Sequence, residues 1–518
     1  GTVIIAQGAD PVSVVPIFAS ERSGAEIVDQ LFLRLAELGP TLRTIGDVGF
    51  TPVLARSWSR RDSLTLVFEL DPRARWHDGR PVTSRDVVFT FALAREDPRI
   101  STSISRIASV TAEGPMSVVM KFTEPYAEQF YDATWHVHIL PEHLLGDIPY
   151  DSIPRSDFAR HPTGSGPFMW ERRVPSQFVE LRANPDFFLG APGLERVIFR
   201  VAGDPEARLN LLLSGAIDVM SGVRPGMVPR LNQAEELRII RAPSSYLSYI
   251  LFNQRDPADT SRRHPILTDI RVRKALVAGI DRNRIARASY GEGTLVPRGP
   301  VPQFFHWVED PHARAADYDP DLARRLLEEA GWRDTDGDGI RDRNGQPLVL
   351  KMNTPGVDQS RADMALRVQQ QLREIGVKLE VLQVAWSMFV ERHNSSNFDL
   401  DFAYAGMDPS PAGLRNSWIC ASAGQAGQNV GFWCNPRFDS LLVAAGRSQD
   451  RSVELYRAAL DVLEADAPAA FMAAPPALIA LHRRFDNVRI RPESLWLSLW
   501  EWTVNPDAML PRDGQVGQ

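Results

Sequence analysis

Short segments with the alternation of β-strands are interspersed with segments of helical periodicity, and this order restricts the fold more than any other feature. Residues 64–70 and 117–122 alternate like strands, whereas 83–96 and 361–376 repeat apolar residues with the period of a helix. A mixed order of this kind is typical of α/β architecture and differs from the runs of one element type in bundles and sandwiches. The sequence therefore predicts α/β lobes.

Capping signals support several of the predicted helices. Thr83 or Ser84 is placed to cap the helix at 83–96, and Pro320 and Gly331 mark the start and stop of a helix at 319–332. A helical run at 269–290 is interrupted near Gly279. The other predicted strands are 178–184, 195–202, 347–353 and 377–384, and the other predicted helices are 205–220 and 451–468.

Length, composition and charge limit the number of domains and the kinds of partner that the protein can have. The 518 residues are 44% hydrophobic and 24% charged, which predicts two to four globular domains or lobes. The net charge is −7 and no basic block occurs, so a nucleic-acid partner is not indicated. No run of 18 apolar residues is present. The chain opens on strand-like TVIIA, a start compatible with prior removal of an export signal or lipid-anchor segment.

Motifs of catalysis are missing. The glycine-rich segment PTGSGPF at 162–168 has neither the phosphate-loop pattern nor the GxSxG spacing, which favours a structural turn. No HExxH motif and no dinucleotide-binding fingerprint occur. We therefore predict that the protein is not an enzyme and uses no cofactor.

Three groups of residues could bind metal or form a covalent link. Cys420 and Cys434 fit neither a redox nor a zinc motif; we predict a disulfide that closes a surface loop, the alternative being two buried thiols. The WHVH segment at 135–138 places His136 and His138 on one side of an extended strand, with His143 nearby, as alternative metal ligands.

The stretch 334–345, DTDGDGIRDRNG, is similar to a calcium loop. Four aspartates occupy positions one, three, five and nine of such a loop and are candidate metal ligands: Asp334, Asp336, Asp338 and Asp342. Position twelve is Gly345 instead of glutamate, and a predicted strand follows instead of a helix. The Asp-Gly and Asn-Gly pairs favour a tight hairpin.

Several spaced blocks, in order along almost the whole chain, resemble the extracytoplasmic solute-binding proteins of family 5, the dipeptide-, oligopeptide-, nickel- and opine-binding components of ABC importers. The blocks are 51–91 with WHDG at 76–79, PTGSGPF at 162–168, 184–219, LFNQ at 251–254 and 264–285. The resemblance implies a two-lobed periplasmic-binding-protein fold of class II (cluster C), α/β, with a ligand cleft between lobes. It places the first lobe at 1–256 with an extra subdomain at about 46–170, the second at 257–486, and a return to the first at 487–518. The polar run 254–265 is the predicted crossover.

The same resemblance indicates which residues face a ligand. Cleft contacts are expected from aromatic and polar side chains that converge. The candidates are Tyr246, Tyr249, Asn253, Arg361, Trp386, Tyr404, Asp408 and Trp418. Each aromatic residue could instead belong to the core. The cysteine pair also lies where the family often has a bridge.

Two departures from the family bear on the solute. The position of the aspartate that binds a peptide amino group falls near Ala405, with Asp408 in a different register, and no arginine stands where the carboxylate partner is expected, although Arg361 is close. A buried charge needs a partner, so these departures disfavour simple dipeptides.

The sequence thus predicts a periplasmic or extracytoplasmic binding component of an ABC importer. It would capture a peptide or peptide-like solute, or a sugar or opine, by hinge closure. Its partners would be the membrane permease subunits, it would be a monomer, and it would bind no nucleic acid. The alternative is a metal or metal-chelate binding protein of the nickel type.

Overall fold

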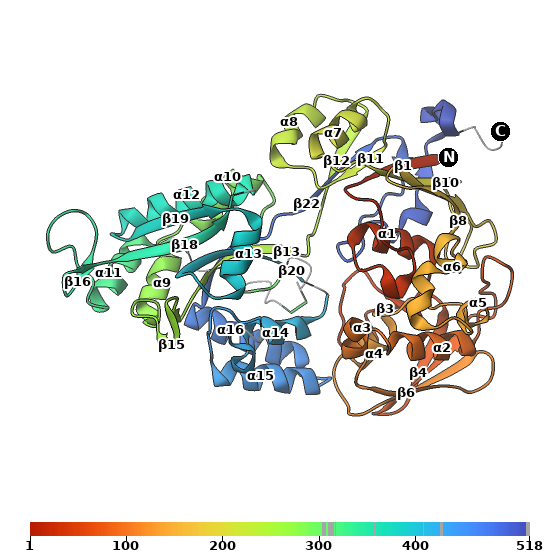
Figure 1. Cartoon of the computed structure of the whole chain (residues 1–518), viewed down its shortest axis with the longest axis horizontal. Coiled ribbons are helices and arrows are strands. Elements are labelled where there is room, and N and C mark those ends of the chain that lie inside the picture. Colours follow the sequence, from red (N-terminus) through yellow and green to blue (C-terminus); the bar gives the residue numbers. More distant parts are fainter. Residues whose placement is uncertain are drawn as a thin grey trace. The chain divides into compact units, whose positions relative to one another are not determined.

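The computed structural model describes residues 1–302, 307–308, 315, 317–356, 358–407, 409–424 and 428–513. They form two α/β units (Figure 1). Unit 1 combines residues 1–242 with the end of the chain from 477, and unit 2 comprises 243–476. In the part of the chain that is described, no helix has the length and apolar character needed to span a membrane.

Unit 1 is built on a mixed seven-stranded sheet in which the first strand is central. β1 (Thr2–Gln7) is almost fully buried and pairs in parallel with β10 (Arg196–Val201) and β11 (Val219–Ser221). The other pairs are antiparallel, and the order is β12-β22-β11-β1-β10-β9-β8. The outer strands are β8 (Phe168–Val174), β9 (Phe178–Ala183), β12 (Leu237–Ala242) and β22 (Ala477–His482).

A second, antiparallel sheet in unit 1 falls within the predicted subdomain at about 46–170. Its order is β4-β5-β7-β6, and α2 (Ser84–Ala94) packs on β6 and β7. Thr83 is the N-cap of α2, one of the two residues that the sequence predicts, and it forms a reciprocal capping box with Asp86. The strands are β4 (Ala55–Asp62), β5 (Thr65–Leu70), β6 (Ile107–Ala112) and β7 (Ser117–Phe122).

Short elements complete unit 1. Two small hairpin-like pairs join β2 (Ala36–Leu38) to β3 (Phe50–Pro52) and β23 (Phe485–Asp486) to β24 (Thr503–Val504). The remaining helices are α1 (Arg22–Leu31), α3 (Pro98–Ser103), α4 (Gln129–Thr134), α5 (Glu142–Leu145), α6 (Asp157–Arg160), α7 (Pro205–Leu213) and α8 (Val228–Leu231).

The PTGSGPF segment is a structural turn packed against the end of α1. A Cβ on Gly164 would lie 1.8 Å from the Leu31 carbonyl oxygen, so only glycine fits. His77 of the WHDG motif holds the turn: its Nδ1 accepts from the Gly164 amide at 3.1 Å, and its Nε2 lies 3.0 Å from the Gly166 carbonyl. Because the Gly164 amide is a donor, this geometry requires neutral His77 with the proton on Nε2.

A buried arginine joins both ends of the chain within unit 1. Arg484 donates to Asp218 (3.0 Å), to Asp513 (2.6 Å) and to the Thr2 carbonyl (2.6 Å). Both carboxylates also accept backbone amides of β1, Asp218 from Ile4 and Asp513 from Thr2. Burial alone would raise the pKa of Asp513, but the Thr2 and Leu510 amides and Arg484 hold it below its usual range.

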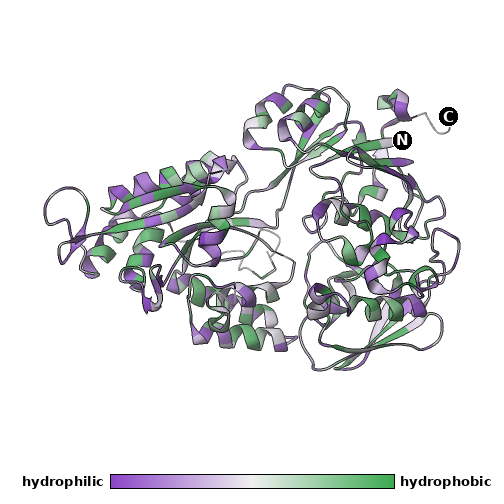
Figure 2. Cartoon of the chain, viewed as in Figure 1, coloured by the Kyte–Doolittle hydropathy of each residue, from purple (hydrophilic) through white to green (hydrophobic). Residues whose placement is uncertain are grey.

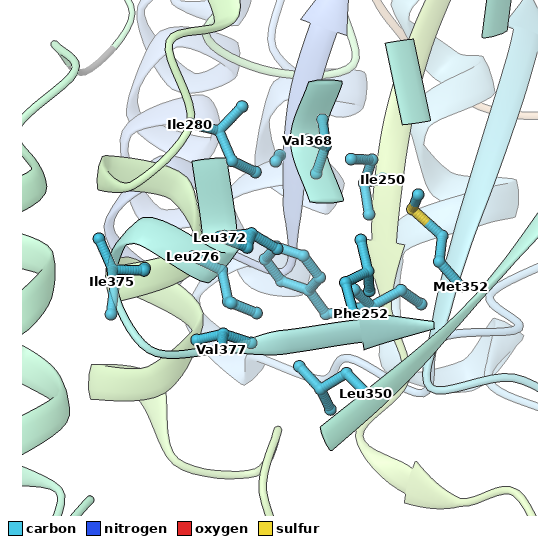
Figure 3. Packing of buried hydrophobic residues seen from close by; sticks show 14 of the residues in the cluster. Ile250, Phe252, Leu276, Ile280, Leu350, Met352, Val368, Leu372, Ile375 and Val377 are labelled. Atoms are coloured by element: carbon cyan, nitrogen blue, oxygen red, sulfur yellow. The ribbon is translucent and has the colours of Figure 1, made fainter. Parts of the chain in front are cut away.

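Unit 2 contains a five-stranded sheet in the order β19-β18-β20-β13-β21. β18 (Val349–Pro355) runs parallel to both β19 (Lys378–Val384) and β20 (Leu400–Gly406), whereas β13 (Tyr246–Phe252) is antiparallel to β20 and to β21 (Ala469–Ala473). Figure 3 shows how apolar side chains of these strands and of the covering helices pack together. The labelled residues are Ile250, Phe252, Leu276, Ile280, Leu350, Met352, Val368, Leu372, Ile375 and Val377.

In Figure 2 the helices of unit 2 carry hydrophilic and hydrophobic residues side by side, as amphipathic helices do. The predicted break near Gly279 separates two of them. They are α9 (Ile270–Ala278), α10 (Arg282–Tyr290), α11 (Pro320–Glu329), α12 (Gln359–Glu374), α13 (Trp386–Asn394), α14 (Leu414–Trp418), α15 (Pro436–Arg447) and α16 (Ser452–Asp466). Four of these helices, α9, α10, α12 and α13, pack on strands of the five-stranded sheet, and α15 packs against α16.

The chain passes between the units at positions that differ from the sequence-based boundaries of 256/257 and 486/487. β13 pairs within the sheet of unit 2, and β22 pairs within the main sheet of unit 1, so the passages fall at 242/243 and 476/477. The polar run 254–265 is not a crossover. It forms the hairpin of β14 (Arg255–Asp256) and β15 (Asp259–Arg263) inside unit 2.

The acidic stretch 334–345 ends in the predicted tight turn. β16 (Asp342–Arg343) pairs with β17 (Gln346–Pro347), and Asn344 and Gly345 between them have positive φ angles of 55° and 73°. Both residues lie in the left-handed region that a two-residue hairpin of this type requires. The hairpin interpretation of this stretch is therefore confirmed.

We predict that replacing Arg484 by methionine lowers the free energy of unfolding by about 3–5 kcal/mol, because buried Asp513 loses its arginine partner and buried Asp218 keeps only Arg512. Chemical denaturation measures this change. Arg489→Met, which breaks an ion pair between exposed Arg489 and Glu501, is the matched control and should cost less than about 1 kcal/mol. Equal effects of the two variants would show that the buried network does not hold unit 1 together.

We also predict a pH dependence of stability from His77. Burial lowers the pKa of His77 to about 4, below the ordinary value of 6.5. Between these values the unfolded chain binds more protons, so the free energy of unfolding falls by about 1 kcal/mol per pH unit as pH drops from 6.5 to 4. Comparing denaturation curves of the wild type and His77→Gln isolates this contribution. An identical pH slope in both proteins would refute the neutral hydrogen-bonded role of His77.

Candidate ligand-binding site

The carboxyl edge of the parallel strands in unit 2 carries a concentration of aromatic side chains. β18, β19 and β20 all end there, and α12 and α13 begin after β18 and β19. Figure 1 shows β13 and β20 in unit 2, where the two strands are antiparallel neighbours. The first residue of β13, Tyr246, therefore lies opposite Gly406 at the same edge. In open α/β sheets this edge is where ligands bind.

Two stacked pairs of rings stand at this edge. Tyr246 and Tyr404 have ring centroids 5.0 Å apart with 10° between their planes, and Trp386 and Phe389 have centroids 5.5 Å apart with 21°. Three of the rings are open to solvent, with exposed fractions of 37% for Tyr246, 42% for Tyr404 and 51% for Trp386. Large exposed aromatic rings that lie together are a common mark of a binding surface.

A buried guanidinium lies among these rings. The Cζ atom of Arg361 is 5.3 Å from the Tyr404 ring centre, 5.9 Å from Trp386 and 5.7 Å from Phe389. Such distances allow cation–π attraction to rings of both pairs. We call Tyr246, Arg361, Trp386, Phe389 and Tyr404 the aromatic–arginine cluster.

Arg361 is fixed and partly neutralised by its neighbours. Its Nε donates to Asp358 at 2.9 Å and its Nη1 to the Phe402 carbonyl at 3.2 Å. Asp358 also caps α12 by accepting the Arg361 amide, so the carboxylate and the guanidinium are set by one helix turn. Arg361 Nη2 donates to no group in the part of the chain that the structure describes. The cluster can therefore offer the two N–H groups of Arg361 Nη2 between aromatic surfaces.

Beneath the cluster lies a buried polar group that the sequence analysis missed. Asp401 is fully buried and accepts from Asn353 Nδ2 at 2.7 Å, and His393 Nδ1 lies 2.8 Å from it. His393 stacks on Phe389 of the cluster. The spacing of Trp386, Phe389 and His393 at three and four residues, one face of a helix, is the signal that could have revealed this arrangement.

The other predicted ligand contacts do not join the cluster. Tyr249 is an odd number of residues from Tyr246 along β13, so it faces the opposite side of the sheet, where it packs on Trp418 and Phe471. Burial, and then the Asp401 carboxylate, raise the pKa of the Tyr249 hydroxyl, which therefore stays neutral. Trp418 is 4% exposed and also contacts Trp433.

Asn253 and Asp408 complete the set of predicted ligand contacts. Asn253 lies just beyond the far end of β13, fully buried, and its amide donates to the carbonyls of Ser396 and Phe398. These bonds hold a loop of unit 2 together. Asp408 lies outside the described residues. The structure thus brings together four of the predicted residues: Tyr246, Arg361, Trp386 and Tyr404.

The predicted disulfide is present. Cys420 and Cys434 are bonded, with their Cα atoms 4.5 Å apart. The Asp439 carboxylate of α15 accepts the Cys420 amide, which ties the bridged loop to the helix that follows. The alternative of two buried thiols is therefore wrong.

The histidines do not gather as metal ligands. His136, His138 and His143 each contact a different carboxylate, those of Asp132, Asp29 and Asp78. WHVH is also not a strand, because Trp135 caps the end of α4 and an irregular segment follows. Burial lowers the pKa of His138 to about 4.

Within the described part of the chain, one group of three or more acidic, histidine or cysteine side chains has a spacing that could hold a metal ion. It consists of the exposed residues Asp334, Asp336 and Asp338. Their carboxylates accept amides of the turn itself: Asp334 from Gly337 and Gly339, Asp336 from Asp338, and Asp338 from Ile340. Asp342 instead accepts the amide and hydroxyl of Thr335. These contacts are those of an Asp-rich turn.

Comparison with known proteins places the chain in a family. The family model "Bacterial extracellular solute-binding proteins, family 5 Middle" matches residues 49–426, well over half of the chain. The chain therefore belongs to family 5 of the bacterial extracellular solute-binding proteins. It is the extracytoplasmic solute-binding component of an ABC importer.

Individual relatives agree with this family. The oligopeptide-binding protein AppA of Bacillus subtilis (strain 168) is 25% identical over 512 residues, which are 97% of this chain and 91% of AppA. The putative ABC transporter peptide-binding protein BAB2_0812 of Brucella abortus (strain 2308) is 32% identical over 382 residues, 71% of this chain and 68% of that protein. The crystal structure of the substrate-binding protein CtaP of Listeria monocytogenes has a TM-score of 0.83 at 23% identity and covers 98% of this chain and 99% of CtaP. This similarity shows that the fold is shared.

Proposed function

We propose that this chain captures peptides or peptide-like solutes and that the aromatic–arginine cluster of unit 2 contacts them. The names of the sequence relatives support a peptide ligand, since AppA and the Brucella protein are both named for peptide binding. A sugar or an opine is the other ligand class that the sequence predicts. Capture by hinge closure stays a prediction.

The observation that carries the proposal is a fixed N–H donor between exposed aromatic faces. Arg361 is 4% exposed, and Asp358 already balances its charge at 2.9 Å. A ligand carbonyl can accept from Nη2 without bringing a charge of its own, whereas an ion pair with a ligand carboxylate gains less from a guanidinium that is already paired. Planar amide groups and apolar side chains can pack on the rings of Tyr404 and Trp386. The cluster therefore suits a peptide bound through its backbone better than a free dipeptide held by its charges.

The proposed role includes no chemistry. In the described part of unit 2, buried Asp401 and His393 form a pair of the kind found in catalytic sites, in which His393 would be the base. A nucleophile must reach the base by a hydrogen bond, and no serine, threonine or cysteine does so here. We propose that the protein releases its solute unchanged to membrane permease subunits, acts as a monomer, and works outside the cytoplasm, in the periplasm or on a lipid anchor.

Alanine substitution of the exposed rings tests the proposal. Binding of a library of tri- to nonapeptides, followed by thermal shift and then calorimetry, should identify a ligand that stabilises the wild type. We predict that Tyr404→Ala and Trp386→Ala each weaken this ligand at least about tenfold, or roughly 1.4 kcal/mol, through lost stacking. Each variant should keep the unfolding temperature of the wild type within a few degrees, since Tyr404 is 42% and Trp386 51% exposed.

Tyr318→Ala is the matched control. Tyr318 is 39% exposed, like Tyr404. Burial and then the Glu374 carboxylate raise the pKa of the Tyr318 hydroxyl, and Glu374 is at the far end of α12, about 20 Å along the helix from Arg361. Unchanged affinity in Tyr404→Ala and Trp386→Ala would refute the cluster as the binding surface. Stabilisation by nickel alone, lost in His136→Ala with His138→Ala, would instead favour the metal-binding alternative.

A further inference from the structure

β12 forms an outer edge of the main sheet in unit 1, and one side of its backbone has no neighbouring strand among the described residues. It pairs with β22 over its full length of six residues. The Arg483 amide donates to the Glu236 carbonyl, next to the antiparallel pairing of β12 with β22. In an antiparallel pair every second residue bonds to the neighbouring strand, so the backbone groups of Glu236, Arg238 and Ile240 face β22. The N–H and C=O of Ile239 therefore point away from β22, toward the open edge.

A hollow lies on each face of this edge strand. One, of about 630 Å³, is lined by β12 and by α8 with the loop after it, including Val228, Asn232, Leu237 and Ile239. The other, of about 650 Å³, is lined by Arg238, Ile240 and residues 486–489. Figure 1 shows α8 beside β12 in unit 1. A strand added to this edge would send its side chains alternately to the two faces.

Arginine side chains give the first hollow a positive character. Three arginines line it, Arg238, Arg241 and Arg483, together with one acidic residue, Glu235. Arg238 donates to the Phe485 carbonyl at 2.7 Å, and Arg483 donates to the Glu235 carbonyl at 2.9 Å. Carbonyl partners carry no net charge, so the arginines outweigh the single Glu235 carboxylate and the hollow is positive overall. The second hollow is closer to neutral, because Arg489 there is paired with Glu501. An incoming strand with acidic side chains on one face complements this distribution.

We propose that the outer edge of β12 is a docking site for an extended acidic segment of a partner protein, which adds to the sheet as an eighth strand. Main-chain hydrogen bonds to Ile239 would supply affinity, and acidic side chains beside Arg238 and Arg483 would set specificity and register. Long edges of this kind are normally shortened, bent or covered. This site lies in unit 1 and is independent of the proposed solute surface in unit 2.

A capped heptapeptide of alternating glutamate and valine is the probe. At low salt we expect it to bind the full-length wild type, and hydrogen exchange at the Ile239 amide to slow at least tenfold in the complex. A copy of the peptide N-methylated at every backbone amide has no N–H donor on either edge and should not bind. No binding of the parent peptide at 1 mM, equal binding of the methylated copy, or unchanged exchange at Ile239 would each overturn the proposal.

Two variants separate backbone pairing from charge. Ile239→Pro removes the outward N–H, and proline is tolerated at such an edge position, so affinity should fall about tenfold while the β12–β22 pairing is kept. Arg483→Glu should weaken binding strongly at low salt, whereas Arg43→Glu, the same charge change on an exposed side chain elsewhere in unit 1, should not. Equal effects of the two arginine variants would reduce the interaction to net charge and would refute a site at β12.

Discussion

The integrity of unit 1 depends on the buried charge network around Arg484. One guanidinium binds Asp218 after α7, Asp513 near the end of the described chain, and the carbonyl of Thr2 at its beginning. These segments are separated by hundreds of residues, and unit 2 is inserted between two of them. A buried charge costs several kcal/mol unless each of its partners is in place. The network therefore requires that both ends of the chain dock before unit 1 is complete, and it sets β1 at the centre of the main sheet.

Unit 2 uses charge in a different way, at a surface. Asp358 caps α12 and holds Arg361, so the guanidinium is oriented before any ligand arrives. Preorganisation of this kind reduces the entropy that binding must overcome. In the proposed binding role, the exposed rings of Tyr246, Trp386 and Tyr404 would supply affinity for many peptide sequences through shape and stacking. A solute-binding protein that accepts varied peptides needs contacts of this general type.

Local signals in the sequence predicted much of the fold. The capping box of Thr83 and Asp86, the break between α9 and α10, and the Asn344–Gly345 hairpin all follow from residues within a few positions of each other. The passages between units were misplaced because they depend on which distant strand β13 and β22 pair with. Composition could not show this, since the polar run 254–265 is equally compatible with a linker and with the hairpin that it forms.

The candidate site was also predictable only in part, because its residues depend on strand register and burial as well as on local sequence. Aromatic residues near strand ends were found from the sequence, and four of the predicted residues meet in the cluster. Strand alternation, once the register is known, separates Tyr249 from Tyr246, and burial assigns Trp418 to the core. The pairing of Asp358 with Arg361 was readable as an N-cap three residues from an arginine. That the Asp358 carboxylate balances the charge of the Arg361 guanidinium could be learned only from the three-dimensional structure.

The most direct test of the central claim is a crystal structure of the protein with a bound peptide that stabilises it. The account predicts that peptide atoms contact the rings of Tyr404 and Trp386 and that a peptide carbonyl accepts a hydrogen bond from Arg361 Nη2. A peptide bound elsewhere, with these three side chains free of contact, would contradict it.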